Sequence, residues 1–185
     1  MKLIISVILS LTCLFATVSW ADTSVQTHST IVSAIPTTAA TPAAYAAGDV
    51  VGTKLSFTGA VRGAVGGETP AFTGLVTQVT MTDLGAEGKN MELVLFCQDP
   101  SGTTFTDNGA LDIADADLVK VCGSALVNSH SAFADNGFSQ AQNLAIPIDL
   151  SSSGATTLYG ALVAREAVTL DADGVLKVFV GIVQD

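Results

Sequence analysis

The stretch Met91–Pro100, MELVLFCQDP, constrains the fold of this chain more than any other part of the sequence. Its four central residues, Leu93–Phe96, are all apolar and show no polar alternation. The run stops at Asp99–Gly102, where Pro and Gly favour a turn. A short apolar run bounded by turn residues is typical of a strand buried on both faces. The stretch therefore predicts a central β-strand.

Most of the remaining chain alternates between short β-like runs and turns rich in Gly, Asp, Asn and Ser. In the run Phe72–Thr82 the residues Leu75, Thr77, Val79 and Met81 stand at alternate positions, which predicts a strand. Pro147 interrupts another run and predicts an edge strand or a bulged strand. The predicted strands are Ser24–Ile35, Val50–Phe57, Phe72–Thr82, Met91–Cys97, Val119–Val127, Leu144–Leu150, Thr156–Ala164 and Val175–Val183.

Adjacency along the chain suggests which strands pair. Phe72–Thr82 is expected to lie antiparallel to Met91–Cys97, and Thr156–Ala164 with Val175–Val183 is the clearest hairpin. One helical turn capped by Asp112 is expected near Ala114–Leu118, and no helix of three turns is predicted. About eight strands with connections of unequal length favour an all-β, jelly-roll-like β-sandwich over a regular meander barrel.

The N-terminus has the pattern of a secretory signal peptide. Lys2 precedes the apolar run Leu3–Val18, and Ser19-Trp20-Ala21 suits cleavage before Asp22. An uncleaved membrane anchor is the alternative, because about twenty apolar residues suffice to span a bilayer. The predicted organisation is a signal-like segment at 1–21, a first strand and a Pro/Ala/Thr-rich arm at 22–48, and a β-sandwich domain at 49–185.

Charge and hydropathy limit the partners of the chain. Seven Lys and Arg against 17 Asp and Glu give a net charge of −10, which repels nucleic-acid phosphates. Removing residues 1–21 takes away Lys2 and no acidic residue, so the mature charge would be −11. Only 13% of residues are charged and the mean hydropathy is +0.53. Such a composition fits a subunit that buries surface against its neighbours, or a β-domain rich in Gly, Ala and Thr.

No catalytic or cofactor motif is present in the sequence. The nucleophile elbow, the phosphate-binding loop and the HExxH metal motif are all missing, so an enzyme and a cofactor are not expected. His28 and His130 are expected to be solvated or hydrogen-bonded loop residues. After loss of Trp20 the mature chain has no Trp for stacking against a sugar ring.

The connection after the central strand is acidic. Calcium prefers several oxygen ligands in a flexible loop, so one hypothesis is a calcium site, and the other is a solvated loop with helix-capping carboxylates. No EF-hand spacing supports the calcium hypothesis, and no metal site is predicted. The candidate ligands are Asp107, Asp112, Asp115 and Asp117.

Two cysteines remain after cleavage, Cys97 and Cys122, each in an apolar strand-like run. Export would permit a disulfide between them. Spacing along the sequence does not show that their Cβ atoms meet, so two buried thiols and one disulfide both stay open. There is no CxxC motif and no Cys/His cluster, so a zinc site is not predicted.

Four blocks of the sequence carry a family resemblance that covers residues 24–185. In order along the chain they are AAYAAGDVVG (43–52), LVLFCQDPSGTTFTDNGALDIADADLVKV (93–121), TTLYGALVARE (156–166) and LKVFVGIVQD (176–185). Together they resemble a family of structural proteins from tailed bacteriophages, of the head-decoration or cement type with a jelly-roll fold. The signal-like segment at 1–21 departs from that family.

The resemblance implies a non-enzymatic structural protein located in the virion. Its expected partners are the major capsid protein or other virion subunits, together with copies of itself, with a trimer favoured. Binding to nucleic acid is not expected, nor to a membrane once the signal is cleaved. The alternative hypothesis, which follows from the N-terminus, is an exported β-sandwich that assembles into a cell-surface or extracellular structure.

Overall fold

The computed structural model describes residues 28–38, 43–62, 72–85, 88–170 and 176–184. This part of the chain is mostly β, which confirms the predicted all-β class, and the strand pairs are antiparallel. Its elements are β1 (His28–Ala34), β2 (Ala43–Tyr45), β3 (Leu55–Phe57), β4 (Thr73–Asp83), β5 (Met91–Phe96), α1 (Asp115–Leu118), β6 (Val121–Val127), β7 (Ser129–Ala132), β8 (Gly137–Ala141), β9 (Ile146–Asp149), β10 (Leu158–Ala164), β11 (Val168–Leu170) and β12 (Leu176–Gln184).

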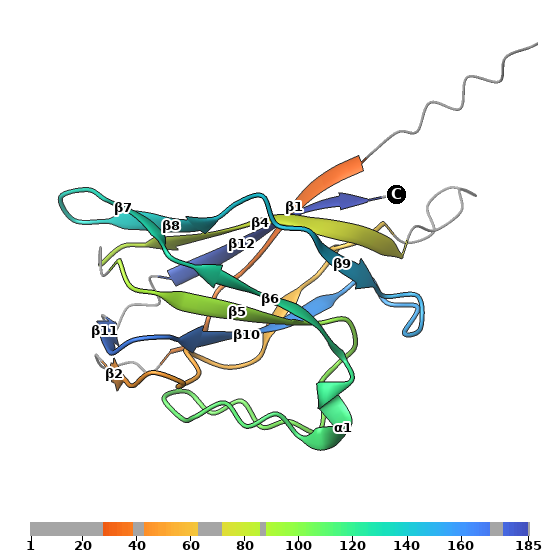
Figure 1. Ribbon diagram of the computed structural model, residues 1–185, viewed down its shortest axis with the longest axis horizontal. Helices are drawn as coiled ribbons and strands as arrows, with labels where there is room; N and C mark the ends of the chain where they lie inside the picture. Colours follow the sequence, from red (N-terminus) through yellow and green to blue (C-terminus); the bar gives the residue numbers. More distant parts are fainter. Residues whose placement is uncertain (1–27, 39–42, 63–71, 86–87, 171–175, 185) are drawn as a thin grey trace, which may run out of the picture.

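The strands form two principal sheets that lie over one another (Figure 1). The six-stranded sheet has the order β1-β12-β4-β8-β7, with β9 also paired to β4. The four-stranded sheet has the order β3-β10-β5-β6, and β11 pairs with β2 in a small separate ribbon.

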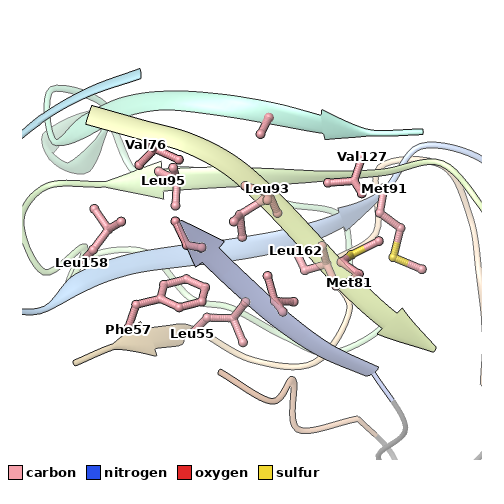
Figure 2. Close-up of a cluster of buried hydrophobic side chains, with 14 of the residues drawn as sticks. Leu55, Phe57, Val76, Met81, Met91, Leu93, Leu95, Val127, Leu158 and Leu162 are labelled. Atoms are coloured by element: carbon pink, nitrogen blue, oxygen red, sulfur yellow. The ribbon is translucent and has the colours of Figure 1, made fainter. Parts of the chain in front are cut away.

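The main core lies between the two sheets (Figure 2). Val76 and Met81 of β4 belong to this core together with Leu93 of β5 and Leu162 of β10, and all four side chains are buried. Burying one such side chain contributes about 1.5–3 kcal/mol. The buried alternate residues of β12 (Val178, Val180, Ile182) extend the same layer, as period-two alternation requires.

The prediction that β5 is buried on both faces is confirmed. Leu93 and Leu95 face the main core, whereas Val94 and Phe96 belong to a second apolar cluster on the opposite side of the four-stranded sheet. The acidic connection covers that side: the Phe105 ring meets the Phe96 ring edge-on, with centroids 6.0 Å apart. Figure 1 shows this connection and α1 beneath β5 and β10.

Both predicted pairings of neighbouring strands are wrong. β4 and β5 lie in different sheets, and so do β10 and β12. In each case the two strands belong to different layers, which are about 10 Å apart in a typical pair of packed sheets. Residues 84–90 are long enough for such a crossing. Strands close in sequence therefore face one another across the core. The hydrogen-bonded neighbours of β5 are β10 and β6, and β6 follows the acidic connection at residues 97–120.

The predicted alternation of the strand at Phe72–Thr82 is only half right. Val79 and Met81 are buried as expected, but the register against β12 shifts near Thr77, which is the extra residue of a β-bulge. A bulge reverses the side on which earlier residues of the strand point. Val76 is therefore in the core, and Leu75 faces outward with 38% of its surface exposed.

Other elements differ from the expectations in detail. The helical turn exists as α1, but its N-cap is Ala114 without a side-chain cap, so the predicted capping by Asp112 is wrong. The β7–β8 hairpin was missed because its sequence is polar, and His130 lies in β7 rather than in a loop. Pro147 does lie in an edge strand, β9, whose one partner among the described strands is β4. The signal-like segment 1–21 lies outside the described residues.

Candidate functional site

The acidic connection between β5 and β6 is attached to β2 and to the segment that follows it. The Tyr45 hydroxyl donates a 2.8 Å hydrogen bond to Oδ1 of Asp107, and the Gly52 amide donates a 2.7 Å bond to the same oxygen. Burial, followed by the hydrogen bond to Asp107 and its negative charge, raises the pKa of the Tyr45 phenol. The Asp107 carboxylate thus binds two residues that are distant in sequence, Tyr45 at the end of β2 and Gly52 in the segment after it.

Backbone hydrogen bonds strengthen this attachment. The Val50 amide donates to the Gly109 carbonyl, and the Asn108 amide donates back to the Val50 carbonyl, at 2.8 and 2.9 Å. Asn108 has a φ of 58°, a left-handed conformation that Asn adopts more easily than most residues. Residues 106–109 (TDNG) therefore attach the acidic connection, by hydrogen bonds to β2 and the segment after it, over the four-stranded sheet. We call this attachment the clasp.

Asp117 of α1 has a separate structural role. Its carboxylate is buried, accepts a 2.8 Å hydrogen bond from the Thr103 hydroxyl and lies 2.7 Å from the Lys120 ammonium. The hydrogen bond from Lys120 is the main cause that lowers the pKa of Asp117. Thr103 also accepts a bond from the Ala114 amide at the start of α1.

The four candidate calcium ligands are not brought together. Asp107 bonds to Tyr45, Asp117 to Lys120, and Asp112 and Asp115 are exposed. Within the ranges that the structure describes, no three His, Cys, Asp or Glu residues gather in a way that could hold a metal ion. Asp107 and Asp117 therefore act as separate hydrogen-bond acceptors.

Cys97 and Cys122 are joined by a disulfide, with their Cα atoms 5.7 Å apart. The bridge ties the end of β5 to the start of β6 and closes the acidic connection at its base. It lies beside a groove of about 540 Å³ between β9 and the β5–β6 end. The groove also includes the exposed side chain of Val119 and two charged residues, Lys120 and Asp149.

His130 takes part in an arrangement that resembles a nucleophile with its base. Nδ1 of His130 lies 2.6 Å from the Ser139 hydroxyl, and Nε2 lies 3.3 Å from Oδ1 of Asn90. Acyl transfer also needs space for a substrate next to the nucleophile. Ser139 is buried and the cavity beside it is only about 10 Å³. The three residues therefore serve as cross-strand polar contacts between β7, β8 and the start of β5.

The outer side of the six-stranded sheet is uncharged over three cross-strand rows, and we call it the uncharged face. Ile31, Leu75 and Pro147 are its exposed apolar residues, and Lys177 borders it with its ammonium 4.9 Å from the centre of the Phe179 ring. The rows, read from the registers, are Ser29–Val183–Leu75–Pro147, Ile31–Gly181–Gln78 and Ser33–Phe179–Thr80–Gln140.

No sequence motif marked this face, because its members come from five strands and share a side only through their registers. The signal that could have found it is the scarcity of charge along β1 and β12.

No helix in the described part of the chain is long and apolar enough to cross a membrane. A scan against protein-family models gives no match, and a search of curated proteins gives none either.

Proposed function

We propose that this chain is a non-enzymatic structural protein of a phage particle, which decorates or stabilises the capsid by contacts with the major capsid protein or other virion subunits. The four sequence blocks that resemble phage decoration proteins suggest this function. The uncharged face is the structural observation that carries it.

The topology supports a jelly roll as the fold. Numbered along the chain, the eight main strands pair first with last (β1–β12), second with seventh (β3–β10), third with sixth (β4–β9) and fourth with fifth (β5–β6). Such nested pairing arises when one long antiparallel hairpin is rolled into two sheets, as in the jelly rolls of many viral capsid domains.

The contrast between the two outer faces supports protein–protein contact. The acidic connection covers the four-stranded sheet, whereas among the described residues no segment covers the uncharged face. In a chain of net charge −10, a surface with exposed apolar residues, whose three rows contain no charged residue, has a low electrostatic cost of contact with another protein. Contact there requires no catalytic group.

Mass spectrometry of gradient-purified phage particles tests the proposal, with peptides of residues 28–184 expected in fixed ratio to the major capsid protein. The variant Leu75→Lys places a charge on the uncharged face and should reduce incorporation at least tenfold. Leu126→Lys is the matched control, because Leu126 is similarly exposed, at 47%, but lies in β6 of the other sheet. Absence of the wild-type chain from particles, or equal loss for both variants, would refute the proposal.

The Cys97–Cys122 disulfide favours a second candidate function, an exported β-sandwich that assembles into a cell-surface or extracellular structure. Disulfides persist in oxidising compartments and are rare in the cytosol, and the signal-like residues 1–21 agree with export. Intact-mass measurement separates the candidates: a mature chain beginning at Asp22 in the culture medium, together with its absence from particles, would establish export.

A further inference from the structure

The exposed edges of the two sheets differ in how they are protected against pairing with another chain. Natural sheets protect edges by shortness, proline, charge or a bulge. β3 has three residues, β7 has four, β9 contains Pro147, and β6 is bulged at Cys122, where the register against β5 shifts. Each of these edges carries at least one protective feature.

β1 has none of these features. It is seven residues long, its sequence HSTIVSA contains no proline and no Lys, Arg, Asp or Glu, and its register against β12 is unbroken. Among the described residues, β12 is the one strand that pairs with β1. Ile31, at the centre of the strand, is 65% exposed, and the flanking Ser29 and Ser33 are also exposed.

We propose that β1 pairs antiparallel with β1 of a second copy of this chain across a two-fold axis. A second copy brings a net charge of −10, so self-association is least opposed where the contacting strand carries no charge. A two-fold axis at Ile31 sets Ile31 opposite Ile31 of the partner subunit, Ser29 opposite Ser33, and Thr30 opposite Val32. The strand is therefore complementary to itself.

The pairing makes the six-stranded sheets of two copies continuous. The backbone donors and acceptors on the free side of β1 gain partners, and the two Ile31 side chains gain a cross-strand contact of the kind that stabilises sheets. One strand pair buries less surface than a standard interface, so the dimer should depend on protein concentration. This inference does not require the phage assignment, and it replaces the expected trimer by a two-fold dimer.

Sedimentation velocity of the full chain across a hundredfold concentration range tests the inference. The wild type should shift from monomer to dimer, and Ile31→Lys should weaken the dimer at least tenfold, because the two-fold axis places the two lysines opposite one another. Leu84→Lys is the matched control: Leu84 is 62% exposed but lies in the turn after β4. It should dimerise like the wild type.

A second variant reports the geometry directly. Opposed residues of an antiparallel pair have Cα atoms about 4.5–5.5 Å apart, within the range of a disulfide. Ile31→Cys should therefore form a covalent dimer on mild oxidation, and Leu84→Cys should stay monomeric. A wild type that is monomeric at all concentrations, a trimer, equal effects of the two lysine variants, or no cross-link at position 31 would each overturn the two-fold pairing.

Discussion

The Tyr45 hydroxyl donates a hydrogen bond to Asp107 across a sequence separation of 62 residues. This bond joins the end of β2 to the acidic connection and keeps that connection against the outer side of the four-stranded sheet. Phe105, Leu111 and Ile113 of the connection then cover β5 and β10. Asp107, one of the candidate metal ligands, is thus part of the support for the central strand.

Because of Tyr45, the stability of the folded protein should depend on pH in the alkaline range. Its folded-state pKa is raised above the ordinary value of 10.0, so the folded state retains a proton that the unfolded state loses. The contribution of the neutral phenol is complete below about pH 10 and declines as the pH rises above it. Urea unfolding from pH 8 to 11 should show this decline.

Tyr45→Phe should flatten the alkaline decline and cost about 1–2 kcal/mol at pH 8, because one hydrogen bond to a carboxylate is lost. Tyr159→Phe removes the only other phenol of the chain and is the control. An unchanged alkaline slope in Tyr45→Phe would contradict this assignment.

Gly52→Ala should be among the most damaging single changes outside the core. Gly52 has a φ of +79°, and a Cβ there would lie 2.8 Å from Cβ of Pro36 and 2.9 Å from the Thr37 amide nitrogen. Strain and overpacking together should cost about 2–4 kcal/mol. Gly59→Ala separates the two causes, because Gly59 has a φ of +76° with open space around it. Equal losses in denaturant titration would show that packing against Pro36 is unimportant.

Removal of the disulfide should weaken the whole domain. The bridge spans 25 residues, and the chain-entropy model assigns about 3.5 kcal/mol to a loop of that length. The double variant Cys97→Ala/Cys122→Ala should lose roughly that amount in urea unfolding, and reduction of the wild type should give the same change. A wild type whose midpoint is insensitive to reductant would show that the bridge contributes little.

Because of Asp117, the stability of the folded protein should depend on pH in the acidic range. The Lys120 ammonium holds the pKa of this carboxyl below its ordinary 3.8, so its contribution is present above that pH and is lost as the pH falls through the lower folded-state value. Asp117→Asn should lower the melting temperature at pH 7 and reduce the loss between pH 5 and 2. Asp112→Asn, at an exposed position, should do neither.

Removal of calcium should have no effect, because the four aspartates of the connection are apart. The melting temperature measured with excess chelator should match the value with millimolar calcium within one degree or so. A fall of several degrees on chelation would mean that a cation site exists in the connection.

The local sequence was sufficient to predict β5 and its burial. Four consecutive apolar residues ended by Asp-Pro-Ser-Gly predicted a strand buried on both faces, because no face of such a strand can be left in water at low cost. The same kind of evidence predicted an edge or bulged strand at Pro147, since proline lacks the amide that a central strand must donate. The structure shows the edge strand.

Pairing, in contrast, was set by the tertiary structure. β4 and β5 are neighbours in sequence but lie in different sheets, because the crossing buries the apolar face of each against the other. The bulge at Thr77 turned Leu75 from an expected core residue into part of the uncharged face. The approach of Cys97 to Cys122 likewise depends on the pairing of β5 with β6.

The strand content and the low charge of this protein can therefore be read from its local sequence, since burial preference and turn formation are local properties. The clasp between Tyr45 and Asp107, the uncharged face and the unprotected edge of β1 follow from registers between strands far apart in sequence. Those registers are chosen by the packing of the whole core, which no single segment contains.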